Sequence, residues 1–249
     1  MKFENTEVFN FEGALRGMRN PMNSWDKSDS EWIRLDEYII KDGEVIDDPI
    51  HFYKIGDNDM KLVQKLICAG SEHRKFLRQI FVSVDVTAPM YWWNEFDTYK
   101  VGTVANSTSK MHKLASTPIT MDCFEMDDFD CCIDSKLGYL NNNPCVDVSM
   151  YWYHTTGYME RLRRLYNETK DKKYWKELIR LLPESWLQRR TVTMNYENVL
   201  NMYHQRKNHK LNEWSGKDDP AKPNFCTWVL ELPYAKQFFI EPFEKRGTK

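Results

Sequence analysis

The chain has 249 residues, with 35 Lys and Arg against 37 Asp and Glu and a formal net charge of -2. This length allows one large domain or two small ones, and the balanced charge argues against nucleic-acid binding, which uses a basic field. No apolar run approaches the ~18 residues of a membrane span, and the N-terminal MKFENTEVFNFEG lacks the pattern of a signal peptide. We therefore expect a cytoplasmic protein that binds neither membrane nor nucleic acid.

Hydrophobic periodicity predicts a helix over residues 57–69, DNDMKLVQKLICA. Asp57 or Asn58 suits its N-terminus, because a short polar side chain accepts a hydrogen bond from the first backbone N–H groups. Gly70 is expected to end the helix, because glycine adopts the left-handed conformation common after a last helical turn. The apolar residues at helical spacing, which form the expected buried face, are Met60, Val63, Leu66 and Ile67.

Residues 79–87, QIFVSVDVT, alternate between apolar and polar side chains, which is typical of a half-buried strand. Its apolar side consists of Ile80, Val82, Val84 and Val86. Pro89 then opens an aromatic helix, PMYWWNEF, since proline is tolerated in a first helical turn. Trp92 and Trp93 in this helix are expected in the core or at a subunit interface, with a stacking platform for a ligand as the alternative.

The second half of the chain is predicted to be mainly helical. Residues 155–169 and 171–182 form two amphipathic helices, and Pro183 ends the second. Their expected apolar faces are Leu162, Leu165 and Tyr166 in the first helix and Tyr174, Leu178, Leu181 and Leu182 in the second. Residues 224–234, NFCTWVLELPY, follow a polar loop and form a short apolar helix that closes at Pro233.

An acidic, cysteine-containing stretch around residues 115–150 shows few periodic signals, so we interpret it as an insertion or long loop within a single domain spanning 1–249. The chain has six cysteines and no CxxC pair: Cys68, Cys123, Cys131, Cys132, Cys145 and Cys226. Four of them fall in or near the acidic stretch. Their spacing differs from the common structural zinc sites, so free thiols are the expected state and a zinc site is the alternative.

A helix is also predicted to begin near Asn195, within the segment 191–214. One face of this helix would carry Asn195, Val199, Met202, Tyr203, Arg206 and His209. Arginine is rarely buried without a partner, and its planar guanidinium suits phosphate or carboxylate. Arg206 therefore indicates either an anionic ligand or an ion pair within the chain. His209 lies one turn later, where it either contacts the same ligand or acts as a cation at the helix end.

Residues 97–113, DTYKVGTVANSTSKMHK, form a polar segment with features of a ligand site. Lys100, Lys110 and Lys113 supply positive charge, and Gly102 permits close approach of the backbone. Four hydroxyl groups come from Thr103, Ser107, Thr108 and Ser109. The segment lacks the GxxxxGK[ST] pattern of a P-loop, and a solvated Ser/Thr-rich loop is the alternative interpretation.

These segments together resemble the flavin-dependent thymidylate synthase family, also called the thymidylate synthase complementing proteins. The order of Leu182-Pro183, Thr193-Met194-Asn195 and Arg206 is similar to the C-terminal half of that family. VSVDVTAPMYWWNEF is similar to the family's strand that passes through Ala-Pro into a helix. Cys68-Ala69-Gly70 and the GALRGMR stretch near the start also fit, so the similarity spans most of the chain and leaves residues 115–150 without a counterpart.

The family's signature, RHR followed by Ser, Asn-Glu, Ser and Arg-Tyr, is altered in this chain. The matching positions are Thr98-Tyr99-Lys100, Thr103, Ala105-Asn106, Thr108 and Lys110-Met111. Cations remain at Lys100 and Lys110, and hydroxyls remain at Thr103 and Thr108. The guanidinium groups and the carboxylate are gone, and lysine does not replace arginine in a two-pronged phosphate contact. The resemblance therefore argues for the fold more strongly than for the activity.

The resemblance implies an α+β fold, a mixed sheet flanked by helices, and a homotetramer with sites between subunits. It implies transfer of a methylene from methylenetetrahydrofolate to C5 of dUMP or a related pyrimidine nucleotide, with FAD as hydride donor and NADPH as its reductant. Arg206 would activate the uracil. The expected flavin contacts are Asn195, Thr98, Tyr99, Lys100 and His209, and the expected substrate contacts are Thr103, Asn106, Thr108 and Lys110. The alternative is a relative that binds a nucleotide or a protein and has lost flavin chemistry.

Overall fold

The structure is a computed structural model that describes residues 1–35, 38–41, 44–47, 50–128 and 148–244. Contacts group the chain into two compact units, each made of several segments. The first, here called the α6 unit after its longest helix, contains residues 1–4, 85–99 and 105–191. The second, called the α8 unit, contains residues 5–84, 100–104 and 192–249. The expectation of a single domain remains a prediction.

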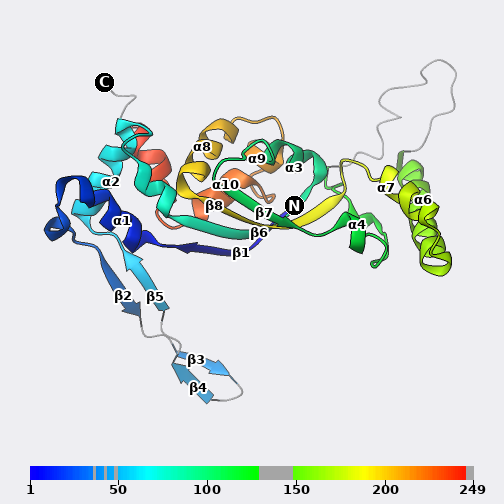
Figure 1. The fold of residues 1–249 in the computed structure, drawn as a ribbon, viewed down its shortest axis with the longest axis horizontal. Helices are drawn as coiled ribbons and strands as arrows, with labels where there is room; N and C mark the ends of the chain where they lie inside the picture. Colours follow the sequence, from blue (N-terminus) through cyan, green and yellow to red (C-terminus); the bar gives the residue numbers. More distant parts are fainter. Residues whose placement is uncertain (36–37, 42–43, 48–49, 129–147, 245–249) are drawn as a thin grey trace. The chain divides into compact units, whose positions relative to one another are not determined.

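A four-stranded sheet has the strand order β1-β6-β8-β7 (Figure 1). Its strands are β1 (Lys2–Phe9), β6 (Phe81–Pro89), β8 (Leu187–Asn195) and β7 (Thr103–Ser107). Strand β6 confirms the predicted alternation, since Val82, Val84 and Val86 are buried and the residues between them are half-buried. The strand runs to Pro89, which is the N-cap of α3 (Met90–Phe96) and not its first helical residue.

The α8 unit is built around an aromatic core. Tyr196 is fully buried, and its ring meets the ring of Phe11 edge-on, with centroids 5.6 Å apart. Its hydroxyl donates to the carbonyl of Pro233 at 2.7 Å, so the polar tip is satisfied inside an apolar cluster. The helices and helical turns of this unit are α1 (Phe11–Arg19), η1 (Asn20–Met22), η2 (Trp25–Lys27), α2 (Asp57–Ala69), η3 (Lys75–Gln79), α8 (Tyr196–Arg206), α9 (Asn212–Ser215), α10 (Phe225–Glu231), η5 (Lys236–Ile240) and α11 (Glu241–Glu244).

Helix α2 has the predicted bounds but a different cap. Gly56 occupies the N-cap position, and neither Asp57 nor Asn58 caps the helix with its side chain. The carboxylate of Asp29 caps it instead, accepting from the backbone N–H of Asn58 at 2.9 Å and of Asp59 at 3.1 Å. The helix ends as predicted, because Gly70 has a φ of 115°. Asp29, which is distant in sequence, therefore caps α2 in place of the first-turn residues predicted from the local sequence.

An antiparallel hairpin also belongs to the α8 unit. Strands β2 (Glu31–Leu35) and β5 (Ile50–Lys54) lie side by side, with Ile33 opposite Phe52 (Figure 1). We call this pair of strands the arm. A second antiparallel pair is formed by β3 (Tyr38–Lys41) and β4 (Glu44–Asp47).

The α6 unit contains the two predicted amphipathic helices, α6 (Val148–Thr169) and α7 (Lys172–Arg180), which pack together. Helix α6 begins seven residues before its predicted start. The turns α4 (Lys110–Lys113) and η4 (Met121–Cys123) precede it. The core of the unit is formed by Leu114, Ile119, Phe124, Met159, Leu162 and Leu178. Thus the described start of the acidic stretch, up to residue 128, packs against helices, whereas residues 129–147 lie outside the described residues.

Candidate functional site

A cavity of about 270 Å³ lies in the α6 unit, beside the segment that resembles the family signature. Ammonium and hydroxyl groups on one part of its wall meet apolar side chains on another. Its lining consists of Thr108, Ser109, Lys110, Lys113, Leu114, Thr117, Pro118, Cys123, Trp186 and Leu187. Ligand pockets generally run from ~300 to 1,000 Å³, so this cavity has room for one part of a nucleotide and not for a dinucleotide.

Backbone hydrogen bonds to β8 fix one edge of this cavity. Thr108 donates from its backbone N–H and its hydroxyl to the carbonyl of Arg189, at 2.9 and 3.2 Å. Gln188 donates from its side chain to the carbonyl of Thr108 at 2.9 Å. The Thr108 hydroxyl is therefore engaged by the protein, which leaves Lys110 as the stronger candidate for an anion. Its Nζ lies 3.6 Å from the sulfur of Met90, a weak acceptor that does not neutralise the charge.

Another part of the cavity wall depends on a carboxylate hub on α6. Arg163 makes a two-pronged contact with Glu160, with both N···O distances at 2.7 Å, and also donates to the carbonyl of Ala115 at 3.1 Å. Glu160 accepts further hydrogen bonds from Arg164 at 2.9 Å and from the backbone N–H of Ile119 at 2.9 Å. These bonds, with that of Arg163 first, lower the pKa of Glu160 from 4.5 to about 2. The hub thereby fastens residues 115–119, which include the cavity residues Thr117 and Pro118, to the helix.

A second group of predicted residues lies at the N-terminus of α8. Asn195 is the N-cap, accepting from the backbone N–H of Asn198 at 3.0 Å. Asn198 in turn donates from its side chain to the carbonyl of Val101 at 2.7 Å. Gly102 follows with a φ of 77°, and a Cβ there would lie 2.7 Å from the oxygen of the Asn198 amide. The helix start and residues 100–103, including the predicted Lys100 and Thr103, therefore form one close-packed backbone cradle.

This cradle retains an unused acceptor. The Asn198 Oδ1 atom is buried and has no hydrogen-bond partner among the residues that the structure describes. An unsatisfied buried amide oxygen costs free energy. The exposed ammonium of Lys100 comes from the same loop. The cradle therefore offers one acceptor, the Asn198 oxygen, and one ammonium group, that of Lys100, which suits a ligand with an N–H or O–H group and a negative charge.

The C-terminal end of α8 brings Arg206 and His209 to the same aromatic ring. The guanidinium carbon of Arg206 lies 4.9 Å from the centroid of the Trp214 ring, a cation–π contact. The His209 ring is 6.2 Å from that of Trp214, and its Nδ1 accepts from the backbone N–H of Leu211 at 3.2 Å. The expectation that His209 extends the helical face is wrong, because α8 ends at Arg206 and His209 lies in the following turn.

Three predicted residues are placed differently. Thr98 follows α3 and donates from its hydroxyl to the carbonyl of Glu95 at 2.7 Å, so it closes that helix. Tyr99 lies with its ring 6.5 Å from that of Phe96. Asn106 is exposed on β7. Of the predicted substrate contacts, the cavity gathers Thr108 and Lys110 and does not include Asn106.

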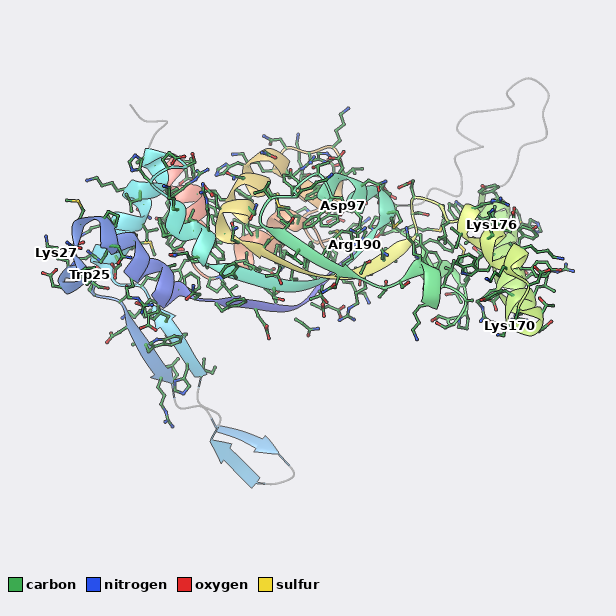
Figure 2. The ribbon with its side chains drawn as sticks, in the orientation of Figure 1. Trp25, Lys27, Asp97, Lys170, Lys176 and Arg190 are labelled. Carbon is green, nitrogen blue, oxygen red and sulfur yellow. The ribbon has the colours of Figure 1, made fainter. Side chains whose placement is uncertain are left out.

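A stacked arginine near the signature segment was not anticipated from the sequence. The guanidinium carbon of Arg190 lies 4.2 Å above the ring of Trp93, and one of its nitrogens donates to Asp97 at 2.7 Å (Figure 2). Trp93 and Trp92 are fully buried, which confirms the core interpretation of both. The sequence analysis also did not include Trp186, which lines the cavity. Its aromatic side chain is the feature that could have indicated a role, but its place in the wall depends on β8, which follows it directly.

The residues that the structure describes contain neither a metal site nor a membrane-spanning helix. Within the residues that the structure describes, no group of three or more His, Cys, Asp or Glu could hold a metal ion. Three of the cysteines considered for zinc, Cys131, Cys132 and Cys145, lie outside the described ranges, and Cys123 is a free thiol. None of the described helices combines the length and apolar character needed to cross a membrane.

Comparison with known proteins identifies the fold. No family model and no curated protein matches the sequence. Two structures of the flavin-dependent thymidylate synthase ThyX from Helicobacter pylori, both with FAD and dUMP, are similar, each with a TM-score of 0.59 and 15% sequence identity. The alignments cover 97% of this chain and 98% of one structure, and 98% and 100% for the other. The chain therefore has the α+β fold of these synthases, a sheet flanked by helices, as predicted.

Proposed function

We propose that this chain is an FAD-dependent enzyme that modifies a pyrimidine nucleotide. The reaction is the transfer of a one-carbon unit from methylenetetrahydrofolate to C5 of dUMP or a related nucleotide. The observation that carries this proposal is the small, lysine-bearing cavity beside the altered signature, in a fold whose solved examples hold FAD and dUMP. A cytoplasmic homotetramer and the use of NADPH belong to the same proposal.

The nucleotide would enter the cavity with its phosphate toward the ammonium groups of Lys110 and Lys113. Charge-assisted hydrogen bonds of this kind are stronger than neutral ones, and Ser109 adds a hydroxyl donor. The apolar side, with Trp186 and Leu187, offers a surface against which a sugar or base packs. Lysine binds phosphate as a point charge and lacks the fixed fork of arginine, so we expect weaker geometric selection among phosphate-bearing ligands.

The hydrogen-bonding groups and the charge of the cradle are compatible with FAD. The unpartnered Asn198 oxygen would accept from an N–H or O–H of the ligand, and Lys100 would face a phosphate. Bound FAD would supply the hydride for reduction of the transferred carbon. The family resemblance alone supports a role for Arg206 of the α8 unit, which is proposed to donate to a uracil carbonyl and stabilise negative charge as C5 becomes nucleophilic. Its guanidinium stacks on the ring of Trp214.

Visible absorption spectra test this proposal. The purified chain is mixed with FAD, passed through a desalting column, and examined with and without dUMP. Flavin bands that remain with the protein and shift on adding dUMP are expected. Lys110→Gln should weaken dUMP binding by roughly tenfold, whereas Lys176→Gln, on the exposed surface of α7 (Figure 2), should leave it unchanged. A protein that takes up no FAD under any of these conditions contradicts the flavoenzyme proposal.

Arg206→Ala separates a role in turnover from a role in stability. If Arg206 contacts the substrate, the variant loses tritium release from C5-labelled dUMP while its melting temperature stays close to that of the parent chain. If the side chain serves an internal ion pair, the melting temperature falls by several degrees.

A second candidate function is a nucleotide-binding protein without flavin chemistry. The specific observation in its favour is the loss of the guanidinium groups from the signature, where Thr98, Lys100 and Lys110 stand instead. This candidate predicts that dUMP binds in calorimetry while FAD does not.

A further inference from the structure

The register of the arm sorts its side chains onto two faces. Residues directly opposite in an antiparallel pair point to the same side, and successive residues along a strand point to opposite sides. Trp32 pairs with Tyr53, and their rings touch edge-on at 5.4 Å. The face opposite to theirs, here called the outer face, carries the cross-strand pairs Glu31–Lys54, Ile33–Phe52 and Leu35–Ile50.

The first face is turned toward helix α1, within the same unit. Trp32 donates from its indole N–H to the carboxylate of Glu12 at 3.0 Å, and Tyr234 donates to the backbone carbonyl of Tyr53 at 2.8 Å. Both faces of the arm are nevertheless largely open, since Trp32 itself is 58% exposed. They differ in chemistry, because the first face carries the pair Arg34–His51 beside its aromatic pair, whereas the outer face carries two adjacent apolar pairs.

The outer face is apolar and open to solvent. Leu35 is 48% exposed, Ile50 45% and Phe52 39%. Scattered apolar residues are normal on a protein surface, but adjacent ones on one face indicate an interaction site. A two-stranded hairpin is also only marginally stable by itself, so burying this face would stabilise the arm as well as a complex.

We propose that the outer face of the arm pairs with the same face of a second copy of this chain. A two-fold axis parallel to the strands places β2 of one copy over β5 of the other, because the rotation exchanges the strands without reversing their level along the axis. Ile33 then faces the partner's Phe52, and Glu31 faces the partner's Lys54. The apolar pairs and the one acid and one base are thus matched by symmetry.

Charge is what favours a second copy over an unrelated partner. Glu31 and Lys54 lie opposite each other in the arm, and among the described residues neither forms an ion pair. A face that carries one charge of each sign at the same level is electrostatically complementary to the same face of a second copy. The pairing does not depend on flavin chemistry. A monomeric parent chain would also contradict the proposed homotetramer, whereas the charge variants test the arm alone.

A charge-swap experiment on the full chain tests the pairing. Self-association of the parent, Glu31→Lys and Lys54→Glu chains is measured by sedimentation over a range of concentrations, and the two variants are then mixed in equal amounts. Each variant alone should associate at least ~10-fold more weakly, since like charges meet across the two-fold axis. The mixture should recover the parent affinity, because arms with two lysines then meet arms with two glutamates.

Two further variants sharpen the result. Leu35→Ser should weaken association in a way that mixing does not repair, and His51→Glu, on the opposite face of the same arm, should have no effect. At protein concentrations too low for association, the melting temperatures of all variants should stay near that of the parent chain, because the changed residues are exposed. A monomeric parent chain, unchanged association in both charge variants, or weakened association that mixing fails to restore would each overturn the proposal.

Discussion

Replacing Glu160 by Gln is expected to destabilise the α6 unit strongly at neutral pH. The amide keeps the size of the side chain but removes the charge that holds Arg163 and Arg164. It also replaces one acceptor oxygen by a donor nitrogen, which cannot accept from Arg163 or from the backbone N–H of Ile119. The change therefore breaks the link between helix α6 and the segment that forms one wall of the cavity.

The pKa of Glu160 gives the magnitude. A carboxyl with a pKa of 4.5 in the unfolded chain and about 2 in the folded protein contributes roughly 3 kcal/mol at neutral pH. The side chain is 15% exposed, so some screening applies and we expect a loss of about 2–3 kcal/mol in the variant. Because the folded pKa is the lower one, this stability is fully present above pH ~4.5 and is lost as the pH falls toward about 2.

Urea unfolding between pH 7 and pH 2 checks this expectation. The parent chain should lose stability across the acid range, and the difference between parent and Glu160→Gln should shrink over the same range. Glu177→Gln is the matched control, because Glu177 forms an ion pair with Arg180 on α7 in which both side chains are well exposed. It should change the free energy of unfolding by less than about 1 kcal/mol. Equal stability of Glu160→Gln and the parent at pH 7 would refute the reasoning.

Other sites allow simpler tests. Gly102→Ala should destabilise the chain by about 1–2 kcal/mol in urea unfolding, because its φ of 77° disfavours a side chain; an unchanged midpoint would contradict the strain. Tyr196→Phe should cost about 1 kcal/mol in the same assay through loss of the buried bond to Pro233, and a neutral effect would argue that this bond contributes nothing. Burial raises the pKa of the Cys226 thiol to about 12, so at pH 8 iodoacetamide should modify it far more slowly than Cys123, as followed by peptide mass spectrometry. Equal rates would mean that the thiol is accessible.

Elements with a strong local signal were predictable from the sequence. Strand β6 and helix α2 follow from the spacing of their buried residues, such as Val84 and Val63. The start of α8 follows from Asn195, whose short amide side chain caps the first turn as the sequence indicates. In each case the residues that decide the structure lie within one or two turns of each other.

Features that depend on distant partners were not predictable. The cap of α2 comes from Asp29. The cavity needs both Trp186 and Lys110 in its lining, and the hydrogen bond from Thr108 to β8 helps to bring their two segments together. The arm was missed because its strands are short and both of its faces mix apolar and charged residues, so alternation is hidden. Candidate site residues such as Thr108 were proposed with the help of the family resemblance, which supplied long-range information that periodicity lacks.

The base of the arm is held by hydrogen bonds that do not involve the arm's own pairing. Ser30 donates to the carboxylate of Asp59 at 2.5 Å and accepts from the backbone N–H of Gly56 at 3.0 Å. The backbone N–H of Ile55 donates to the hydroxyl of Tyr234 at 3.0 Å. The two ends of the segment that forms the arm are therefore held close together, whatever sequence lies between them. Since closure entropy rises only with the logarithm of loop length, a longer, shorter or different segment between these two ends would cost the rest of the molecule little stability.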